Sequence, residues 1–242
     1  TTAAPDRAVV LGHGSQNEMN SWLTNEELNI MSQLEGIEAA SGELYAVVDL
    51  TQRSTGEQAY VVGRGITPAA YAVRPELTLV SGRLPQAGRA ELLVGATAAG
   101  EYLGLALGDE VKLRDSVWQV VGHFDTGGTA NESEIWMDLS LAKSVFRRNG
   151  VSTMRVRLSD TTPMAALQEQ TSGDPRLNIA LVPEEEFYAA QAQARTTLIE
   201  TFTYFIASIM AIGAIIAALN SMYVAVNARK VEIATLRALG FG

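Results

Sequence analysis

One stretch near the C-terminal end limits what this chain can fold into more than any other. From Thr201 to Ala228 no residue is charged, although charged residues make up 19% of the sequence. The stretch has 28 residues, and a helix needs only about 20 apolar residues to cross the hydrocarbon core of a membrane. A buried helix of a soluble protein rarely stays uncharged for so long. The sequence therefore predicts a membrane-spanning helix here.

The charges on either side of this stretch predict its orientation. Arg229, Lys230 and Arg237 follow it, whereas Glu200 and the three glutamates at 184–186 precede it. Positive charge accumulates on the cytoplasmic side of membrane spans. We therefore expect residues 229–242 to be cytoplasmic, residues 1–200 to lie outside the cytoplasm, and the protein to reside in the inner (cytoplasmic) membrane.

The residues around the end of the span form a spaced motif. A short amphipathic helix is predicted from Ala228 to Leu239, and the glycine that follows at position 240 is expected to cap its end. The motif resembles the second transmembrane helix and the following cytoplasmic helix of FtsX-like ABC-transporter permeases, which include the MacB-like exporters. The matching positions are Asn220, Met222, Arg229, Glu232, Ile233, Leu236, Arg237, Ala238 and Gly240. The resemblance implies a longer multi-pass permease, with one span before residue 1 and two after residue 242.

The resemblance also implies a partner for the cytoplasmic end. In these permeases a separate ABC ATPase subunit docks on the cytoplasmic face, so residues 229–242 are expected to form a coupling segment. The residues expected to contact the ATPase are Arg229, Glu232, Ile233, Leu236 and Arg237. An alternative stays open, in which these charges only anchor the span or pair with each other, since Arg229 and Glu232 are three positions apart.

Small residues recur four positions apart inside the span. Such spacing lets two helices approach closely in a membrane, so the sequence predicts a packed helical partner. That partner is either a second permease copy, in a homodimer or heterodimer, or another span of the same protein. The pairs are Ala207 with Ala211, Gly213 with Ala217, and Ala214 with Ala218.

The part of the chain before the span alternates between β-type runs and helical patterns. Two βαβ units are predicted, with short glycine-punctuated strands between them, which gives an α+β fold with a small β-rich insert. The resemblance implies a MacB-like periplasmic core domain over residues 1–183. Its expected parts are a porter-like subdomain at 1–76 and 150–183, a sabre-like insert at 77–149, and then a stalk and transmembrane helix at 184–228.

Composition excludes some functions. The net charge is −9, and because residues 201–242 hold three basic residues and one acidic residue, residues 1–200 carry −11. Nucleic-acid binding needs a basic face, so we expect no nucleic-acid partner. The chain has no cysteine, so its extracytoplasmic part must be stable without disulfide bonds.

The sequence holds no pattern that predicts an active site. No glycine-lysine pair precedes a serine or threonine as in a phosphate-binding loop, and the chain has only two histidines. The loop at 125–134 carries three carboxylates, but without the spacing of a calcium-binding loop. We therefore expect a non-catalytic subunit without a cofactor or a bound metal.

The resemblance implies a permease subunit that couples ATP hydrolysis on a partner to movement of its extracytoplasmic domain. The purpose of that movement would be export or the release of lipids or lipoproteins. Two other classes stay open. One is an ATPase-linked regulatory membrane protein whose ectodomain binds and activates a cell-envelope partner, and the other is a membrane-anchored enzyme. For the permease itself, a periplasmic adaptor or an envelope protein is a further expected partner.

Overall fold

The structure is a computed structural model that describes residues 6–159 and 162–240. It separates into two units, Thr1–Tyr188 and Ala189–Gly242. The first, which we call the ectodomain, is a mixed α+β unit built on a ten-stranded sheet, and the second consists of helix α6 beyond its first turn. The α+β prediction is confirmed. The predicted porter-like and coupling ranges include residues 1–5, 160–161 and 241–242, which lie outside the described residues.

Four strands and two helices form one half of the ectodomain. Their order in the sheet is β10-β1-β9-β2, and each neighbouring pair is antiparallel. Strands β1 and β2 are therefore parallel with β9 between them, and β9 and β10 are parallel with β1 between them. These are the two predicted βαβ units, interleaved as split units. The elements are β1 (Arg7–Gly12), α1 (Asn25–Ser32), β2 (Ile37–Thr51), β9 (Thr153–Leu158), α5 (Met164–Gly173) and β10 (Ile179–Pro183).

The rest of the ectodomain continues the sheet from β2 in the order β3-β8-β5-β7-β4, with β6 paired to β7. Strand β3 lies in the predicted porter-like range, and its register with β8 joins it to the strands of the predicted insert. The elements are β3 (Gln58–Ile66), α2 (Ala69–Val73), β4 (Thr78–Gly82), β5 (Glu91–Gly95), α3 (Ala96–Glu101), β6 (Glu110–Leu113), β7 (Ser116–Asp125), η1 (Ala130–Ser133), β8 (Glu134–Asp138) and α4 (Leu139–Val145).

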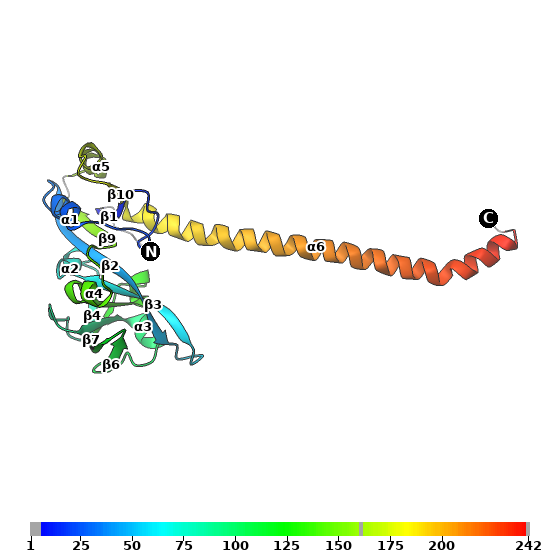
Figure 1. The fold of residues 1–242 in the computed structure, drawn as a ribbon, viewed down its shortest axis with the longest axis horizontal. Coiled ribbons are helices and arrows are strands. Elements are labelled where there is room, and N and C mark those ends of the chain that lie inside the picture. Colours follow the sequence, from blue (N-terminus) through cyan, green and yellow to red (C-terminus); the bar gives the residue numbers. More distant parts are fainter. Residues whose placement is uncertain (1–5, 160–161, 241–242) are drawn as a thin grey trace. The chain divides into compact units, whose positions relative to one another are not determined.

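Strand β2 holds the two halves together. Its first part, up to Glu43, pairs with β9, and its second part, from Leu44, pairs with β3 (Figure 1). The side chains of the two parts pack into separate apolar cores on either side of this crossover. Trp118 and Trp136 are both fully buried, as expected of core tryptophans. Glu43 therefore lies at the junction of the two halves, next to the first residue that pairs with β3.

The start of helix α1 is determined by its local sequence. The Thr24 side chain caps the helix, and the Glu27 side chain accepts a hydrogen bond from the Thr24 backbone N–H at 2.8 Å. This capping box satisfies two backbone donors at the helix start. Leu28, Met31 and Leu34, spaced three positions apart, pack in the core that also contains residues of β9.

Helix α6 (Glu184–Ala238) is continuous, as expected from a segment that contains no proline. Its stretch Ile199–Asn227 has the length and composition to cross a membrane, and its side chains are largely exposed. The helix predicted for the coupling segment is not separate but continues α6, which bends where its colour turns from orange to red in Figure 1. Gly240 follows with φ of 90°, which confirms that the helix ends at this glycine.

Candidate functional site

Charged side chains gather inside the ectodomain at the crossover of β2. Each has less than a tenth of its surface exposed, which is unusual for arginine and glutamate unless they are paired. Because each comes from a different strand, helix or loop, they connect elements that are far apart in sequence. We call this cluster the buried ion network: Arg7, Glu18, Glu43, Arg64, Arg74, Glu134, Arg155 and Glu184.

Arg64 on β3 lies at one centre of the network. Two of its nitrogens donate to the carboxylate of Glu134 on β8, both at 2.7 Å. Its terminal nitrogens also donate to Glu18, at 2.9 and 3.0 Å, and one of them donates to Glu43 at 3.0 Å. Such forked contacts fix the geometry of a guanidinium as well as its charge. Arg64 therefore joins the loop before α1 to β2, β3 and β8.

Glu43 on β2 is the second centre, and it is completely buried. Arg74, which follows α2, binds both of its carboxylate oxygens, at 2.6 and 2.9 Å. The same carboxylate accepts from Arg64, and its Oε2 lies 3.5 Å from the Nε of Arg155 on β9. Three guanidinium groups therefore surround one carboxylate at the point where β2 passes from one half of the ectodomain to the other.

The first turn of α6 is part of the same network. Glu184 accepts a hydrogen bond from Arg155 at 2.8 Å and lies 3.3 Å from the Nε of Arg7 on β1. Phe187 is 3% exposed and packs against β1, while the ring of Tyr188 lies 5.5 Å from the guanidinium carbon of Arg155. The helix that leads to the candidate span therefore begins as a fixed part of the ectodomain.

The eight buried members are four arginines and four glutamates, and Arg7 also pairs at 2.6 Å with Glu76, which is partly exposed. Burial by itself would raise the pKa of Glu18, but the guanidinium groups of Arg64 and Arg155 outweigh it and lower that pKa to about 2. Burial would also raise the pKa of the Glu43 carboxyl group, but Arg74 and Arg64 outweigh this effect and lower that pKa. Both glutamates therefore stay ionised in the folded ectodomain.

Not every buried nitrogen of the network has a hydrogen-bond partner. Among the described residues, the Nε atoms of Arg74 and Arg155 are buried without a hydrogen-bond partner. Both belong to arginines that face Glu43, whose two oxygens already accept several bonds. A buried donor without an acceptor costs about 1–3 kcal/mol. This side of the network is therefore held less firmly than the contacts of Arg64.

The sequence does not predict this network, although a weak signal exists. Glu43, Arg64 and Arg155 each lie within a β-type run whose other members are mostly apolar or glycine. Gly63 and Gly65 flank Arg64, and a Cβ at Gly65 would lie 2.7 Å from the Cβ of Ala142. These glycines let β3 pack closely against its neighbours around the buried arginine.

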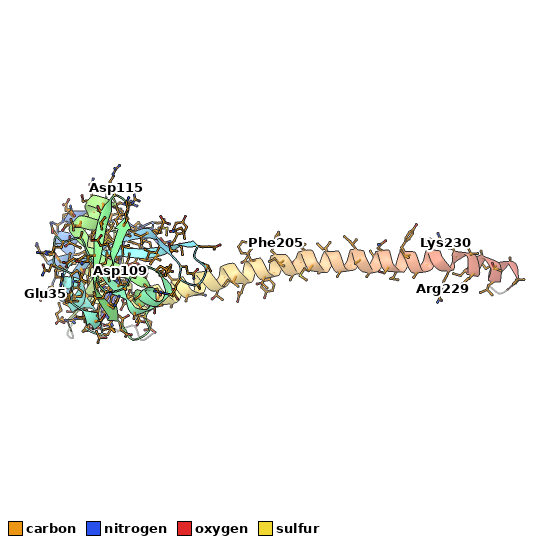
Figure 2. All side chains as sticks on the ribbon, turned by 90° about the horizontal axis from the view of Figure 1, so that it is seen from below. Glu35, Asp109, Asp115, Phe205, Arg229 and Lys230 are labelled. Carbon is orange, nitrogen blue, oxygen red and sulfur yellow. The ribbon has the colours of Figure 1, made fainter. Side chains whose placement is uncertain are left out.

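The residues predicted from the sequence lie in a different place. The coupling residues are on the last turns of α6 and are exposed, and Figure 2 shows Arg229 and Lys230 projecting from opposite sides of the helix. The small residues proposed for helix packing are also exposed, along Ile199–Asn227. Both sets stay predictions, because their expected partners are other chains or other spans.

Other polar groups of the ectodomain have structural contacts. In the loop at 125–134, Glu132 accepts backbone hydrogen bonds from Gly128 and Thr126, and these lower the pKa of its carboxyl group. His123 bonds Ser81 at 2.9 Å and the carbonyl of Leu105 at 2.7 Å. Within 6–159 and 162–240, no group of three or more acidic or histidine side chains is placed to hold a metal ion.

Removing the charge at the centre of the network should destabilise the ectodomain. We expect Glu43→Gln to lower the free energy of unfolding by about 3–5 kcal/mol, because it leaves buried guanidinium groups without their counter-charge. Denaturant unfolding of the full chain in detergent, followed by tryptophan fluorescence, measures this. The matched control is Asp174→Asn, which breaks the exposed pair with Arg176 and should leave the unfolding midpoint unchanged. Equal effects of the two substitutions would contradict the pairing described here.

The lowered pKa of Glu18 predicts how stability changes with pH. Its pKa is about 2 in the folded chain, against an ordinary value of 4.5. Between these values the unfolded chain binds more protons, so stability is present above about pH 4.5 and is lost as the pH falls through about 2. Unfolding midpoints measured across this window should fall more steeply for the wild type than for Glu18→Gln. Parallel curves would show that Glu18 does not titrate as described.

Comparisons with known proteins agree with this architecture. The family model of the MacB-like periplasmic core domain matches residues 2–173. The periplasmic region of MacB from Actinobacillus actinomycetemcomitans has a TM-score of 0.61 at 13% identity, over 81% of this chain and 94% of that one. The extracellular domain of the noncanonic ABC-type transporter YknZ from Gram-positive bacteria has a TM-score of 0.53 at 16% identity, over 67% of this chain and 88% of that one.

A comparison with curated proteins finds no significant match. The two structural likenesses are at low identity and concern the fold alone. The family match, in contrast, extends over most of the sequence. This chain therefore belongs to the family of the MacB-like periplasmic core domain.

Proposed function

We propose that this chain transmits the work of a separate ABC ATPase across the membrane to its ectodomain, for export or for the release of lipids or lipoproteins. The observation that carries the proposal is α6, which starts inside the buried ion network and continues as one helix to Ala238. The same helix thus contains an anchor in the ectodomain, a candidate span and the coupling segment.

The first step of the proposal is the anchor. Glu184 is tied to Arg155 and Arg7, and Phe187 is buried against β1. Through Glu18 and Glu43, Arg155 is in turn connected to Arg64 and so to β3 and β8. A force on α6 would therefore act on both halves of the ectodomain rather than on one strand.

The second step is transmission through the helix. An α-helix is held by a hydrogen bond at every residue, so a displacement of one end is passed to the other. The stretch Ile199–Asn227 contains a single charged residue, Glu200, at its outer end. Basic residues follow this stretch, which favours a cytoplasmic C-terminal end. ATP-driven movement of the ATPase would there meet Arg229, Glu232, Ile233, Leu236 and Arg237.

The third step concerns the assembly. The small residues from Ala207 to Ala218 suit close helix packing, either in a dimer of permeases or against other spans of a multi-pass protein. The subunit itself would be non-catalytic, with ATP hydrolysis on its partner. A periplasmic adaptor or another envelope protein would receive the movement of the ectodomain.

Reversing one charge of the coupling segment should weaken the ATPase partnership. We expect Glu232→Lys to reduce ATPase association about tenfold or more, because a contact charge becomes repulsive. The measurement is co-purification and titration of the full-length permease with its ATPase in detergent. Replacement of residues 229–239 by a neutral linker serves as the complete-loss reference. The matched control is Glu57→Lys, an exposed charge reversal in the ectodomain, which should not alter association. Full association of Glu232→Lys would refute the assigned contact.

Weakening the helix of the stalk, at residues 190–193, should stop movement of the ectodomain without preventing ATPase binding. Replacing residues 190–193 of α6 by four glycines costs about 1 kcal/mol of helix stability per residue, yet leaves the ion network and the coupling segment intact. Because the chain has no cysteine, one cysteine at Glu57 accepts an environment-sensitive dye at a single site. We expect ATP with vanadate to change the dye signal in the parent chain but not in the glycine variant, although both bind the ATPase. If the dye signal of the glycine variant changes as much as that of the parent chain, transmission through α6 is excluded.

A further inference from the structure

A cavity of about 210 Å³ lies in the ectodomain, apart from the buried ion network. Its walls come from four places: the loop before α1, strand β2, the turn between β6 and β7, and the residues after α4. The apolar residues of the wall are Met19, Ala46, Val47 and Phe146, and Tyr45 lies beside them. Strand β2 belongs to the sheet, whereas the other three walls come from segments outside the strands and helices.

Two arginines line this cavity, and no acidic residue does among the residues that the structure describes. Both arginines are exposed, and neither forms an ion pair within the described part of the chain. Arg114 lies over the ring of Phe146, with its guanidinium carbon 5.1 Å from the ring centre. A concave positive site without a counter-charge stands out in a chain with a net charge of −9.

Backbone geometry beside both arginines is also unusual. Arg114 has φ of 54° in the two-residue turn that joins Leu113 to Ser116. Turns of this length favour glycine or asparagine at such positions. Arg147 has φ of 54° directly before Arg148, just past the end of α4, where glycine is the common residue. Of the two lining arginines, only Arg114 itself has this backbone conformation; at the other position it belongs to Arg147, which precedes Arg148 and does not line the cavity.

We propose that this cavity binds a small organic anion. A carboxylate or phosphate group would be held by the guanidinium groups of Arg114 and Arg148, which suit forked contacts to either group. A short apolar part would lie against Met19, Val47 and Phe146. Pockets for drug-sized ligands span about 300–1,000 Å³, so this smaller cavity takes either a small molecule or one end of a larger one. The site does not depend on the ATPase.

The test uses the full chain in lipid nanodiscs and isothermal titration calorimetry, with empty nanodiscs as the baseline for probe partition. The probes are 4-phenylbutyrate, phenyl phosphate, the neutral 4-phenylbutyramide and inorganic phosphate. We expect the two organic anions to bind, the amide not to bind, and inorganic phosphate to bind at least about tenfold more weakly. The stronger organic anion identifies the preferred acidic group. No binding of either organic anion, or equal binding of the amide, would overturn the proposal.

Substitutions locate the binding. Arg114→Gln and Arg148→Gln should each weaken binding of the organic anions about tenfold or more, because each removes charge-assisted hydrogen bonds. Both side chains are exposed, so the variants should unfold at the temperature of the parent chain. Arg147→Gln is the matched control, since it removes the same charge beside the cavity but not from its lining. Binding that survives both lining variants, or falls equally in the control, would overturn the assignment.

Discussion

Pairing between guanidinium and carboxylate groups inside the ectodomain constrains everything around it. Glu43 has no exposed surface, and a carboxylate in that position stays ionised only if cations lie against it. Arg64, Arg74 and Arg155 supply that charge, each from a different element. Desolvating so many ions costs several kcal/mol for each ion, and the attraction recovers this only at good geometry. The network therefore gives positional specificity more than stability, because a shift of β2, β3 or β9 by one residue would leave charges unpaired.

This constraint bears on how α6 is joined to the sheet. An apolar contact alone, such as Phe187 against β1, tolerates sliding because dispersion has little directional preference. The bond from Arg155 to Glu184 at 2.8 Å is directional, and Arg155 also contacts Glu18. A movement of the first turn of α6 must therefore shift Arg155 or break a buried pair. The partly unsatisfied arginines beside Glu43 mark where such a shift meets the least resistance.

Features that depend on neighbouring residues can be predicted from the sequence, whereas those that depend on residues far apart in the chain cannot. The candidate span follows from an uncharged run, the start of α1 from Thr24 and Glu27, and the continuity of α6 from the lack of proline. Strand order is different, because nothing in the residues of β9 indicates that it lies between β1 and β2. The βαβ units are readable as units, and only the fold shows that they interleave.

The buried ion network is beyond sequence reasoning for the same reason. Arg64 lies 46 positions from Glu18 and 70 from Glu134, and Arg155 lies 137 from Glu18. A charge within a β-type run indicates either the solvent face of a strand or a buried pair, and periodicity alone cannot separate the two. The coupling residues of α6 are the opposite case. Their motif is readable from the sequence, whereas the surface that we propose they contact is expected on another chain.

The cavity and the network meet in one short loop. The carboxylate of Glu18 accepts hydrogen bonds from Arg64 and Arg155, and the next residue, Met19, lines the cavity. Tyr45, also in the lining, is two residues after Glu43 on β2. A molecule held in the cavity would restrain the backbone that carries these carboxylates. If the bound molecule favours one arrangement of the network, that arrangement must in turn bind the molecule more tightly, because coupling between two sites is reciprocal. If α6 acts on the network as proposed, ATP-driven movement and the affinity of the cavity for its anion are linked through Glu18 and Glu43.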